Sequence, residues 1–256
     1  MMTLFHRCRS AAWLGFLLPV LIVFASEGLA GEKWPPPVED DRIFSSLLIG
    51  QLEYRWNKGP DTLSWEDVEG WIGGDYNRLV VKTEGQARTA GPSGGQAQGQ
   101  ALYSRLIAPY WDFQAGVRYD RLYGGGPDRS RTFAVAGLEG LAPYWFHVEP
   151  FLFISDRGDV SASLEATYEL LLTQRLIAQP RFEMNVAAQD VEKFGVGSGV
   201  NDIEFDLRVR YEIRREFAPY VGISWTRKLG KTADLARRER EEVDNLAIVA
   251  GLRLWF

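Results

Sequence analysis

Residues that bind metals or form cross-links are scarce in this sequence. Its 256 residues include one cysteine, two histidines and three methionines, which excludes a disulfide scaffold, an iron–sulfur cluster and a zinc finger. The net charge is −5 and no basic block occurs, so nucleic acid is not an expected partner. From residue 31 onward there is no run of 18 consecutive apolar residues, which excludes membrane-spanning helices from this part of the chain.

The first thirty residues have the composition of an export signal. Arg7 and Arg9 precede an uncharged apolar run of 15 residues at 11–25, and residues 28–30 (GLA) offer a small-residue cleavage site. This order is typical of a secretory signal peptide. Cleavage would leave no cysteine, because Cys8 lies in the signal. We therefore expect a cleaved signal peptide at 1–30, a short periplasmic segment at 31–42 and a folded domain at 43–256.

Beyond the signal, side chains alternate between apolar and polar with a period of two. In 202–213 every odd position is apolar and every even position is charged. The runs 160–170 and 176–186 largely repeat this alternation. Strands of this length, with one apolar and one polar face, are typical of membrane β-barrels, whereas strands in soluble sandwiches have about 5–6 residues. The pattern predicts an all-β fold, a transmembrane antiparallel β-barrel with its apolar face toward lipid.

An internal repeat predicts the number of strands. The tripeptide Ala-Pro-Tyr occurs at 108–110, 142–144 and 218–220, and Pro180 falls between the last two copies. The four prolines are 34, 37 and 39 residues apart, and each interval can hold one hairpin of two long strands. About 12 strands then fit between residue 31 and the end of the chain. Pro180 itself lies inside a strand pattern, and the pattern gives no reason for it.

The expected strands are joined alternately by short turns and long loops, as in outer-membrane barrels. They lie at 44–56, 63–73, 76–84, 100–108, 111–120, 131–140, 144–153, 160–170, 175–187, 201–213, 217–225 and 245–256. Tyr76, Tyr110, Tyr144 and Tyr220 lie next to short turns and predict an aromatic girdle at the membrane interface. The charged segment at 226–244 is expected to be a solvated external loop.

Several blocks of the sequence resemble the copper resistance protein B family. They are 41–44 (DRIF), 51–56 (QLEYRW), 70–79 (GWIGGDYNRL), 108–120 (APYWDFQAGVRYD), 170–176 (LLLTQRL) and 211–222 (YEIRREFAPYVG). The resemblance implies a bacterial outer-membrane barrel, in contact with outer-membrane lipid, that takes part in copper homeostasis and resistance. It also implies copper as the ion and a periplasmic multicopper oxidase as a partner. Family members often carry a long Met- and His-rich leader, whereas residues 31–40 contain neither residue.

One histidine remains after the signal, and it is the candidate copper ligand. His147 alternates with Phe146 and Val148 and shares its face with Glu149, so both polar side chains should face the lumen near a short turn. Imidazole nitrogen and carboxylate oxygen are ligands for Cu(II), which makes His147 and Glu149 the predicted metal residues. The alternative is a histidine hydrogen-bonded to a carboxylate without a metal. Met184 has lipid-facing parity, so Cu(I) should find no sulfur ligand.

Other charged residues share the lumen-facing parity, and we expect them to pair across strands and to narrow the lumen. They are Glu53, Arg55, Arg78, Lys82, Arg118, Glu165, Glu169, Arg181, Glu183, Arg208, Arg210 and Arg253. On this basis, Leu207→Arg on the lipid face should be much more damaging than Arg208→Leu in the lumen.

The sequence contains no arrangement of nucleophile, histidine and carboxylate with usable spacing, so no catalytic residue is predicted. The first expectation is therefore a non-enzymatic outer-membrane barrel. An outer-membrane barrel enzyme that acts on lipid is the second. The third is a secreted soluble β-barrel that binds an apolar ligand, which would need its apolar face inside and its charged face in water.

Overall fold

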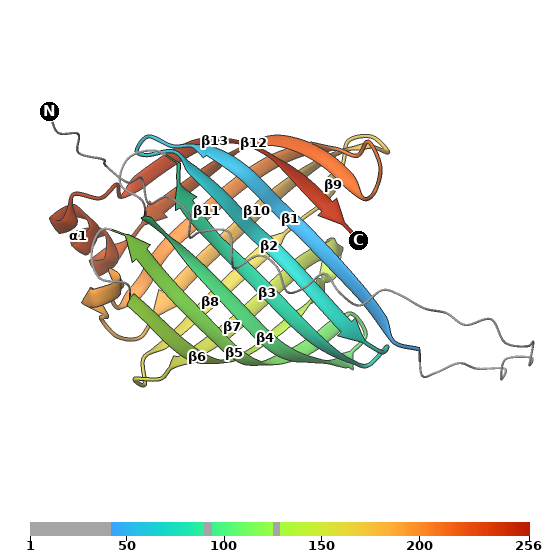
Figure 1. Ribbon diagram of the computed structural model, residues 1–256, viewed down its shortest axis with the longest axis horizontal. Coiled ribbons are helices and arrows are strands. Elements are labelled where there is room, and N and C mark those ends of the chain that lie inside the picture. The colour runs from blue at the N-terminus through green and yellow to red at the C-terminus, as the bar shows by residue number, and fades with distance from the viewer. Residues whose placement is uncertain (1–41, 90–93, 125–128) are drawn as a thin grey trace, which may run out of the picture. The chain divides into compact units, whose positions relative to one another are not determined.

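The computed structural model describes residues 42–89, 94–124 and 129–256. The expected signal peptide at 1–30 and nearly all of the expected segment at 31–42 lie outside these residues. The described chain forms one closed antiparallel β-barrel (Figure 1). The expected all-β barrel is therefore confirmed.

The wall contains twelve strand positions, because the two-residue strand β9 continues β8 against the same neighbour, β10. The strands are β1 (Phe44–Trp56), β2 (Thr62–Gly73), β3 (Asn77–Arg88), β4 (Gly94–Ala108), β5 (Trp111–Gly124), β6 (Arg129–Ala142), β7 (Phe146–Ser155), β8 (Val160–Thr167), β9 (Leu170–Leu171), β10 (Leu176–Ala187), β11 (Gly199–Tyr211), β12 (Phe217–Lys228) and β13 (Asp244–Trp255). Each strand pairs antiparallel with the next one in the chain, except that β8 and β9 both pair with β10, and β13 pairs with β1 to close the barrel.

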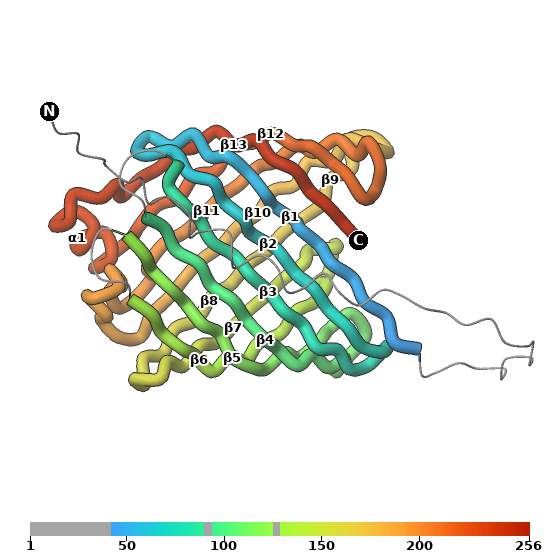
Figure 2. The backbone as a smooth tube through the Cα atoms, viewed as in Figure 1, coloured from blue at the N-terminus to red at the C-terminus, as the bar shows by residue number. Residues whose placement is uncertain are grey.

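The two ends of the barrel differ in their connections (Figures 1 and 2). At the short-turn end the strands are joined at 74–76, 109–110, 143–145, 172–175 and 212–216. The opposite, long-loop end carries the remaining connections, including 188–198 and 229–243. The expected alternation of short turns and long loops is confirmed only in part, because 57–61 and 156–159 at the long-loop end are no longer than the turn at 212–216.

The connection at 229–243 contains a helix that the sequence pattern did not predict. Helix α1 (Gly230–Glu239) buries Thr232, Ala233 and Ala236 and leaves its arginines outside. The buried stripe is too short, and the charged residues around it too many, to give a helical pattern in the sequence. No helix in the described ranges is long and apolar enough to cross a membrane.

Pro180 has a structural reason in the neighbouring strand. It lies in β10 opposite the gap between β8 and β9, where Tyr168 donates its N–H to the Pro180 carbonyl at 3.1 Å. Proline has no N–H to return to Tyr168, so the ladder is broken at this point. The proline in β10 therefore accounts for the interruption between β8 and β9 in the adjacent strand.

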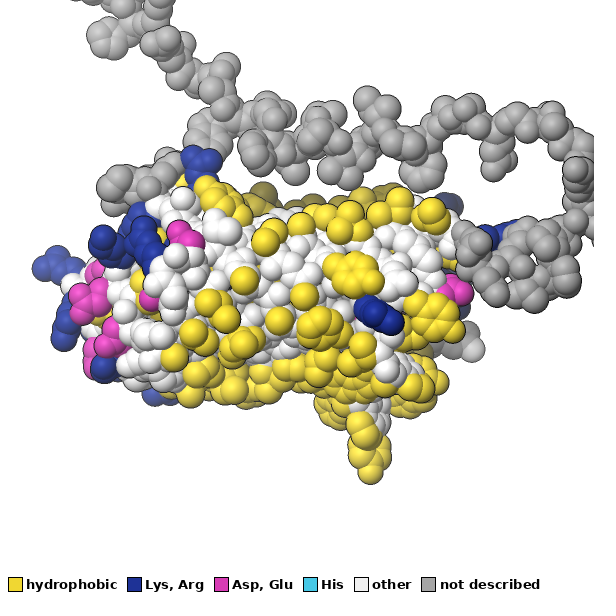
Figure 3. Space-filling view, turned by 90° about the horizontal axis from the view of Figure 1, so that it is seen from below, with side chains coloured by type: hydrophobic (Ala, Val, Ile, Leu, Met, Phe, Trp, Pro, Cys, Tyr) yellow, Lys and Arg dark blue, Asp and Glu magenta, His cyan; other side chains and the backbone are white. Residues whose placement is uncertain are grey.

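Side chains alternate between the outer wall and the lumen as predicted. Leu207 is 43% exposed on the outer wall, whereas its neighbour Arg208 is 2% exposed inside. Apolar side chains cover much of the wall in the view of Figure 3, and charged side chains gather at the end that carries α1. This distribution is opposite to that of a soluble barrel with an apolar interior.

The aromatic girdle is only partly as expected. Tyr76, Tyr110 and Tyr144 lie at the short-turn end and are 67%, 67% and 85% exposed. Tyr220 was wrongly assigned to the girdle, because it is 5% exposed and its hydroxyl donates to Glu53 in the lumen at 2.9 Å. The parity of β12 determines this orientation, whereas proximity to a turn does not.

Candidate metal site in the barrel lumen

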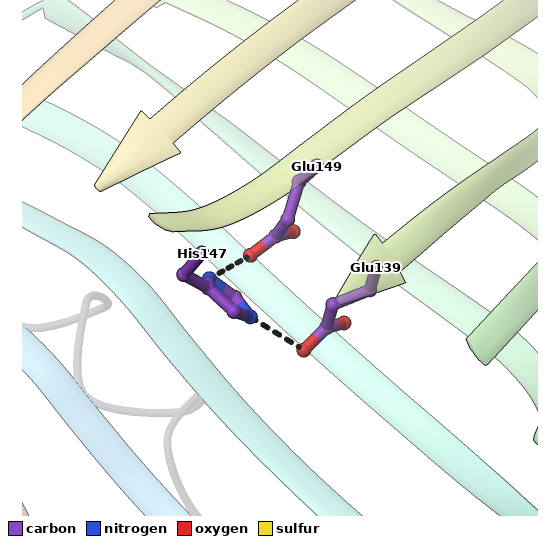
Figure 4. Close-up of side chains that lie close together, drawn as sticks. All are labelled: Glu139, His147 and Glu149. Carbon is purple, nitrogen blue, oxygen red and sulfur yellow. Dashed lines mark ion pairs between the residues drawn. The ribbon is translucent and has the colours of Figure 1, made fainter. Parts of the chain in front are cut away.

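Three side chains with metal-binding atoms meet in the lumen near the short-turn end (Figure 4). His147 is the second residue of β7, and Glu149 follows it on the same face. Glu139 comes from β6, on the other side of the turn at 143–145. Ligand atoms from the three residues lie within 4.8 Å of one another. We call these residues the carboxylate–histidine cluster.

The β6–β7 hairpin brings the cluster together. Its register pairs Leu141 with His147 and Gly140 with Val148, so Glu139 and Glu149 lie at matching levels on the lumen-facing side. The sequence predicted His147 and Glu149 but missed Glu139. Counting back from the Ala-Pro-Tyr turn along the hairpin would have found it, because a short turn fixes the register of its strands.

The imidazole of His147 lies between the two carboxylates. Its Nε2 is 3.4 Å from Oε1 of Glu139, and its Nδ1 is 3.5 Å from Oε1 of Glu149. This is the arrangement of a histidine bound to carboxylates, and the same three groups are the ones that a cation would use. One nitrogen and two oxygens suit Cu(II), whereas Cu(I) prefers sulfur.

Met184 does not supply a sulfur to this site. It pairs with Ile203 and Leu164 in the adjacent strands, on the face of β10 that carries Phe182. Glu183, on the opposite face, contacts Arg181 in the lumen at 2.5 Å. The expected outward orientation of Met184 is therefore what the strand shows.

A lysine from across the lumen contacts the cluster. The Nζ of Lys82, in β3, is 2.8 Å from Oε2 of Glu139 and 2.7 Å from Oε2 of Glu149. It is also 3.4 Å from Oε2 of Glu69. Gln114 in β5 donates to the same Oε2 of Glu139 at 2.7 Å. Each carboxylate thus has one oxygen toward Lys82 and the other toward His147.

The cluster is accessible from the short-turn end. The side chain of His147 is 39% exposed. A cavity of about 510 Å³ lies at this end, next to the start of β1 and the end of β13, and Glu69, Trp71, Arg253 and Trp255 are among its lining residues. Glu69 lines this cavity and also contacts Lys82, whereas the three residues of the cluster do not line it.

Toward the long-loop end, aromatic rings and cations fill the same side of the lumen. Lys82 lies 5.4 Å from the Phe151 ring centre, Arg118 lies 4.7 Å from that of Phe153, and Arg131 lies 5.0 Å from that of Phe133. Arg131 is also 3.9 Å from the ring centre of Phe194, in the connection at 188–198. We call Arg118, Arg131, Phe133, Phe151, Phe153 and Phe194 the cation–aromatic column.

The connection at 188–198 is held over this end of the column. Arg129 donates to the carbonyl of Lys193. Thr232 in α1 accepts the N–H of Gly197 at 2.9 Å, and Lys231 lies 2.8 Å from Asp190. These contacts join the connection to both β6 and α1, so the long-loop end is covered on this side.

The other side of the lumen is filled by ion pairs. Arg208 contacts Glu53 through two nitrogens at 2.9 and 3.0 Å and Asp206 at 2.8 Å. Arg55 contacts Glu53 and Glu66, both at 2.7 Å. Glu53, Asp206 and Arg208 are each less than 5% exposed. The expected cross-strand pairing of luminal charges is therefore present.

Arg181 extends this network across the barrel. It lies in β10 and contacts Asp206 at 3.1 Å and Glu165 at 2.9 Å. It also comes within 3.7 Å of Glu66, which belongs to β2 on the other side of the β13–β1 closure. We call Glu53, Arg55, Glu66, Arg181, Asp206 and Arg208 the ion-pair network.

The sequence from 43 to 256 matches the family of the copper resistance protein B precursor (CopB). The chain belongs to this family. Copper resistance protein B of Escherichia coli is 43% identical over 219 residues, which cover 86% of this chain and 72% of the relative. The copper resistance protein B homolog of Pseudomonas syringae pv. tomato is 44% identical over the same coverage.

The fold of this chain is similar to that of a solved barrel of distant sequence. The NanC porin superposes with a TM-score of 0.51 and 10% identity, over 81% of this chain and 98% of the porin. At this identity the likeness concerns the barrel alone. Together with the family, it favours a copper resistance barrel over a lipid-acting enzyme or a secreted soluble barrel.

Proposed function

We propose that this copper resistance barrel resides in the outer membrane and binds Cu(II) through Glu139, His147 and Glu149. The short-turn end would face the periplasm, as in outer-membrane barrels. The observation that carries the proposal is the position of His147 between two carboxylates, with its side chain 39% exposed near this end. The apolar outer wall supports contact with lipid.

The proposed role is binding rather than catalysis. The cluster offers one imidazole and two carboxylates. These three ligands are harder than thiolate or thioether sulfur and suit Cu(II). We expect weak binding of Cu(II) and hardly any binding of Cu(I), because the described lumen brings no sulfur to the cluster. Protons compete for the same atoms, so Cu(II) affinity should fall as the pH is lowered.

Calorimetry on the purified barrel in detergent tests this assignment. Cu(II) should bind to the wild type and lose most of its affinity in His147→Ala and Glu139→Gln. Glu169→Gln is a matched control, because Glu169 pairs with Arg210 instead of with the cluster. Cu(II) binding that survives His147→Ala, or tight stoichiometric binding of Cu(I), would contradict the ligand assignment.

Location and physiological role have their own tests. An outer-membrane barrel should show heat-modifiable migration on gels and should resist carbonate extraction, whereas recovery from the soluble periplasm would exclude it. Deletion should reduce growth on graded copper, with zinc and silver as controls. If the cluster carries this role, His147→Ala should reproduce part of the loss.

We also propose that a periplasmic multicopper oxidase is the partner, as the family resemblance implies. Its approach would be from the short-turn end, where Tyr110 and Tyr144 project from the turns and are 67% and 85% exposed. A photo-crosslinking residue at Tyr144 should capture the oxidase in cells. A matched residue at Arg157, in the connection between β7 and β8 at the long-loop end, should not.

A further inference from the structure

Lys82 occupies a special position relative to the carboxylate–histidine cluster. It projects from β3, whereas the cluster belongs to β6 and β7 on the other side of β4 and β5. Its side chain is 15% exposed, and its ammonium lies against the Phe151 ring. The lysine therefore reaches across the lumen and ends at the proposed metal site.

Lys82 and His147 use different oxygens of the same two carboxylates. The ammonium contacts Oε2 of Glu139 and of Glu149, at 2.8 and 2.7 Å. The imidazole faces Oε1 of both residues, at 3.4 and 3.5 Å. A cation bound by the imidazole and the two Oε1 atoms would therefore have a fixed positive charge on the far side of its own ligands.

We propose that Lys82 is the positioning residue of the copper site and sets its affinity low enough for release. The proposal rests on the proposed function, because it concerns the same three ligands. The hydrogen bonds of Lys82 hold both carboxylates with Oε1 toward the imidazole, as groups behind a metal ligand commonly do. Its charge opposes the bound cation through those carboxylates.

Lys82 affects the Cu(II) affinity in two opposite ways. By holding the carboxylates in place it raises the affinity, and by its positive charge it lowers the affinity. We expect the charge effect to be the larger one. Without Lys82, Glu139 would still accept a hydrogen bond from Gln114, and the hairpin register would still hold Glu149 beside Glu139. By contrast, the repulsion between an ammonium and a divalent cation separated by one carboxylate is strong in a shielded lumen. Loss of the charge should therefore tighten Cu(II) binding.

Three variants separate charge from positioning. Lys82→Gln removes the charge and keeps a hydrogen-bond donor, Lys82→Met removes both, and Lys82→Arg keeps both. We expect Cu(II) affinity in calorimetry to rise about tenfold or more in Lys82→Gln, less in Lys82→Met, and to change little in Lys82→Arg. Cu(II) release to a chelator in stopped-flow measurements should slow in the same order.

Two further measurements distinguish a change in copper binding from a folding defect or a change of ligands. Heat-modifiable gel migration identifies the variants that fold, and Lys82→Gln serves where Lys82→Met does not fold. Electron paramagnetic resonance should show nitrogen coupling from one imidazole in the wild type and in Lys82→Gln, since the ligands stay the same. A purely structural lysine would not change release rate while leaving this signature intact.

The results also separate this inference from the proposed function. If Cu(II) binds through His147 but Lys82→Gln binds equally or more weakly, the role of Lys82 is wrong and the site remains. If neither the wild type nor Lys82→Gln binds Cu(II), both proposals fail. Binding that becomes measurable only when the charge is removed would support Lys82 as the residue that limits affinity.

Discussion

The lumen is filled in two different ways on its two sides. Along β10, β11, β1 and β2, the ion-pair network crosses the barrel with buried arginines and carboxylates. Along β3 to β7, Leu102, Phe133 and Phe151 belong to a buried apolar cluster, and the cation–aromatic column shares Phe133 and Phe151 with this cluster. The first side relies on matched charges, and the second relies mainly on packing around aromatic rings outside the carboxylate–histidine cluster and its contact with Lys82.

This difference predicts two kinds of sensitivity. A buried ion is costly when its partner is removed, and the cost falls when both partners are replaced together. A truncated core ring leaves a void that no second truncation repairs. Substitutions on the two sides should therefore be similar in cost but different in their response to a compensating change.

The largest effect should come from Arg208→Leu on the charged side. The substitution leaves Glu53 and Asp206 buried without this partner, which should lower the free energy of unfolding by about 3–5 kcal/mol. The sequence alone suggested a mild effect, because parity shows that Arg208 faces the lumen but not that it is 2% exposed. Urea unfolding in detergent micelles measures the change.

The double variant Glu53→Leu with Arg208→Leu is its control. It should recover a large part of the loss, although Arg55 then loses one of its carboxylates. A double variant that is less stable than Arg208→Leu alone would mean that the network does not behave as a matched set of charges.

On the aromatic side, Phe133→Ala should lower the free energy of unfolding by about 3 kcal/mol through loss of packing. Phe133 is 5% exposed and contacts Phe153, Arg118 and Arg131. Trimming Phe153 as well should add to the cost instead of reducing it. Recovery of stability in that double variant would remove the contrast between the two sides.

Tyr220→Phe gives a smaller test of the charged side. It deletes the hydroxyl that donates to Glu53 and keeps the ring in place. Glu53 retains Arg208 and Arg55, so the loss should be about 1–2 kcal/mol. An unchanged free energy of unfolding would show that the arginines alone satisfy this carboxylate.

The smallest effect concerns the covered long-loop end. Hydrogen bonds from Lys231 and from the Ser198 N–H lower the pKa of Asp190 to about 2. A carboxyl whose pKa falls on folding stabilises the folded loop above about pH 4 and loses this contribution as the pH falls toward 2. Hydrogen exchange at 188–198 should be faster in Asp190→Asn than in wild type at pH 5, with the difference much smaller at pH 2 and lost below it. A difference that is as large at pH 2 as at pH 5 would assign the effect to something other than this charge.

The strands were predictable because membrane strands alternate strictly, as in 202–213, which lies almost entirely in β11. The end of β3 and the beginning of β4 were harder to predict from the sequence. These strands run to Arg88 and from Gly94, through glycine, glutamine and alanine that give no apolar signal although their backbones pair. Helix α1 was missed for a similar reason, since only three of its small side chains are buried.

The sequence predicted some residues of the candidate site but not all of its contacts. Parity and a single histidine identified His147 and Glu149, and the hairpin register could have added Glu139. Lys82 was placed in the lumen but not at the cluster, because the sequence does not show which side chains meet across a barrel. That contact depends on barrel closure and on the reach of a lysine over β4 and β5.

The covered long-loop end has a consequence for the permeability of the cell envelope. Porins enclose a water-filled channel through which small solutes can pass. In this barrel, Arg131 lies between Phe133 and Phe194, and the ion-pair network fills the opposite side. On the proposed location in the outer membrane, a solute that passes along either side would have to displace these side chains, so we expect extra copies of this barrel to add less leakage than extra copies of a porin.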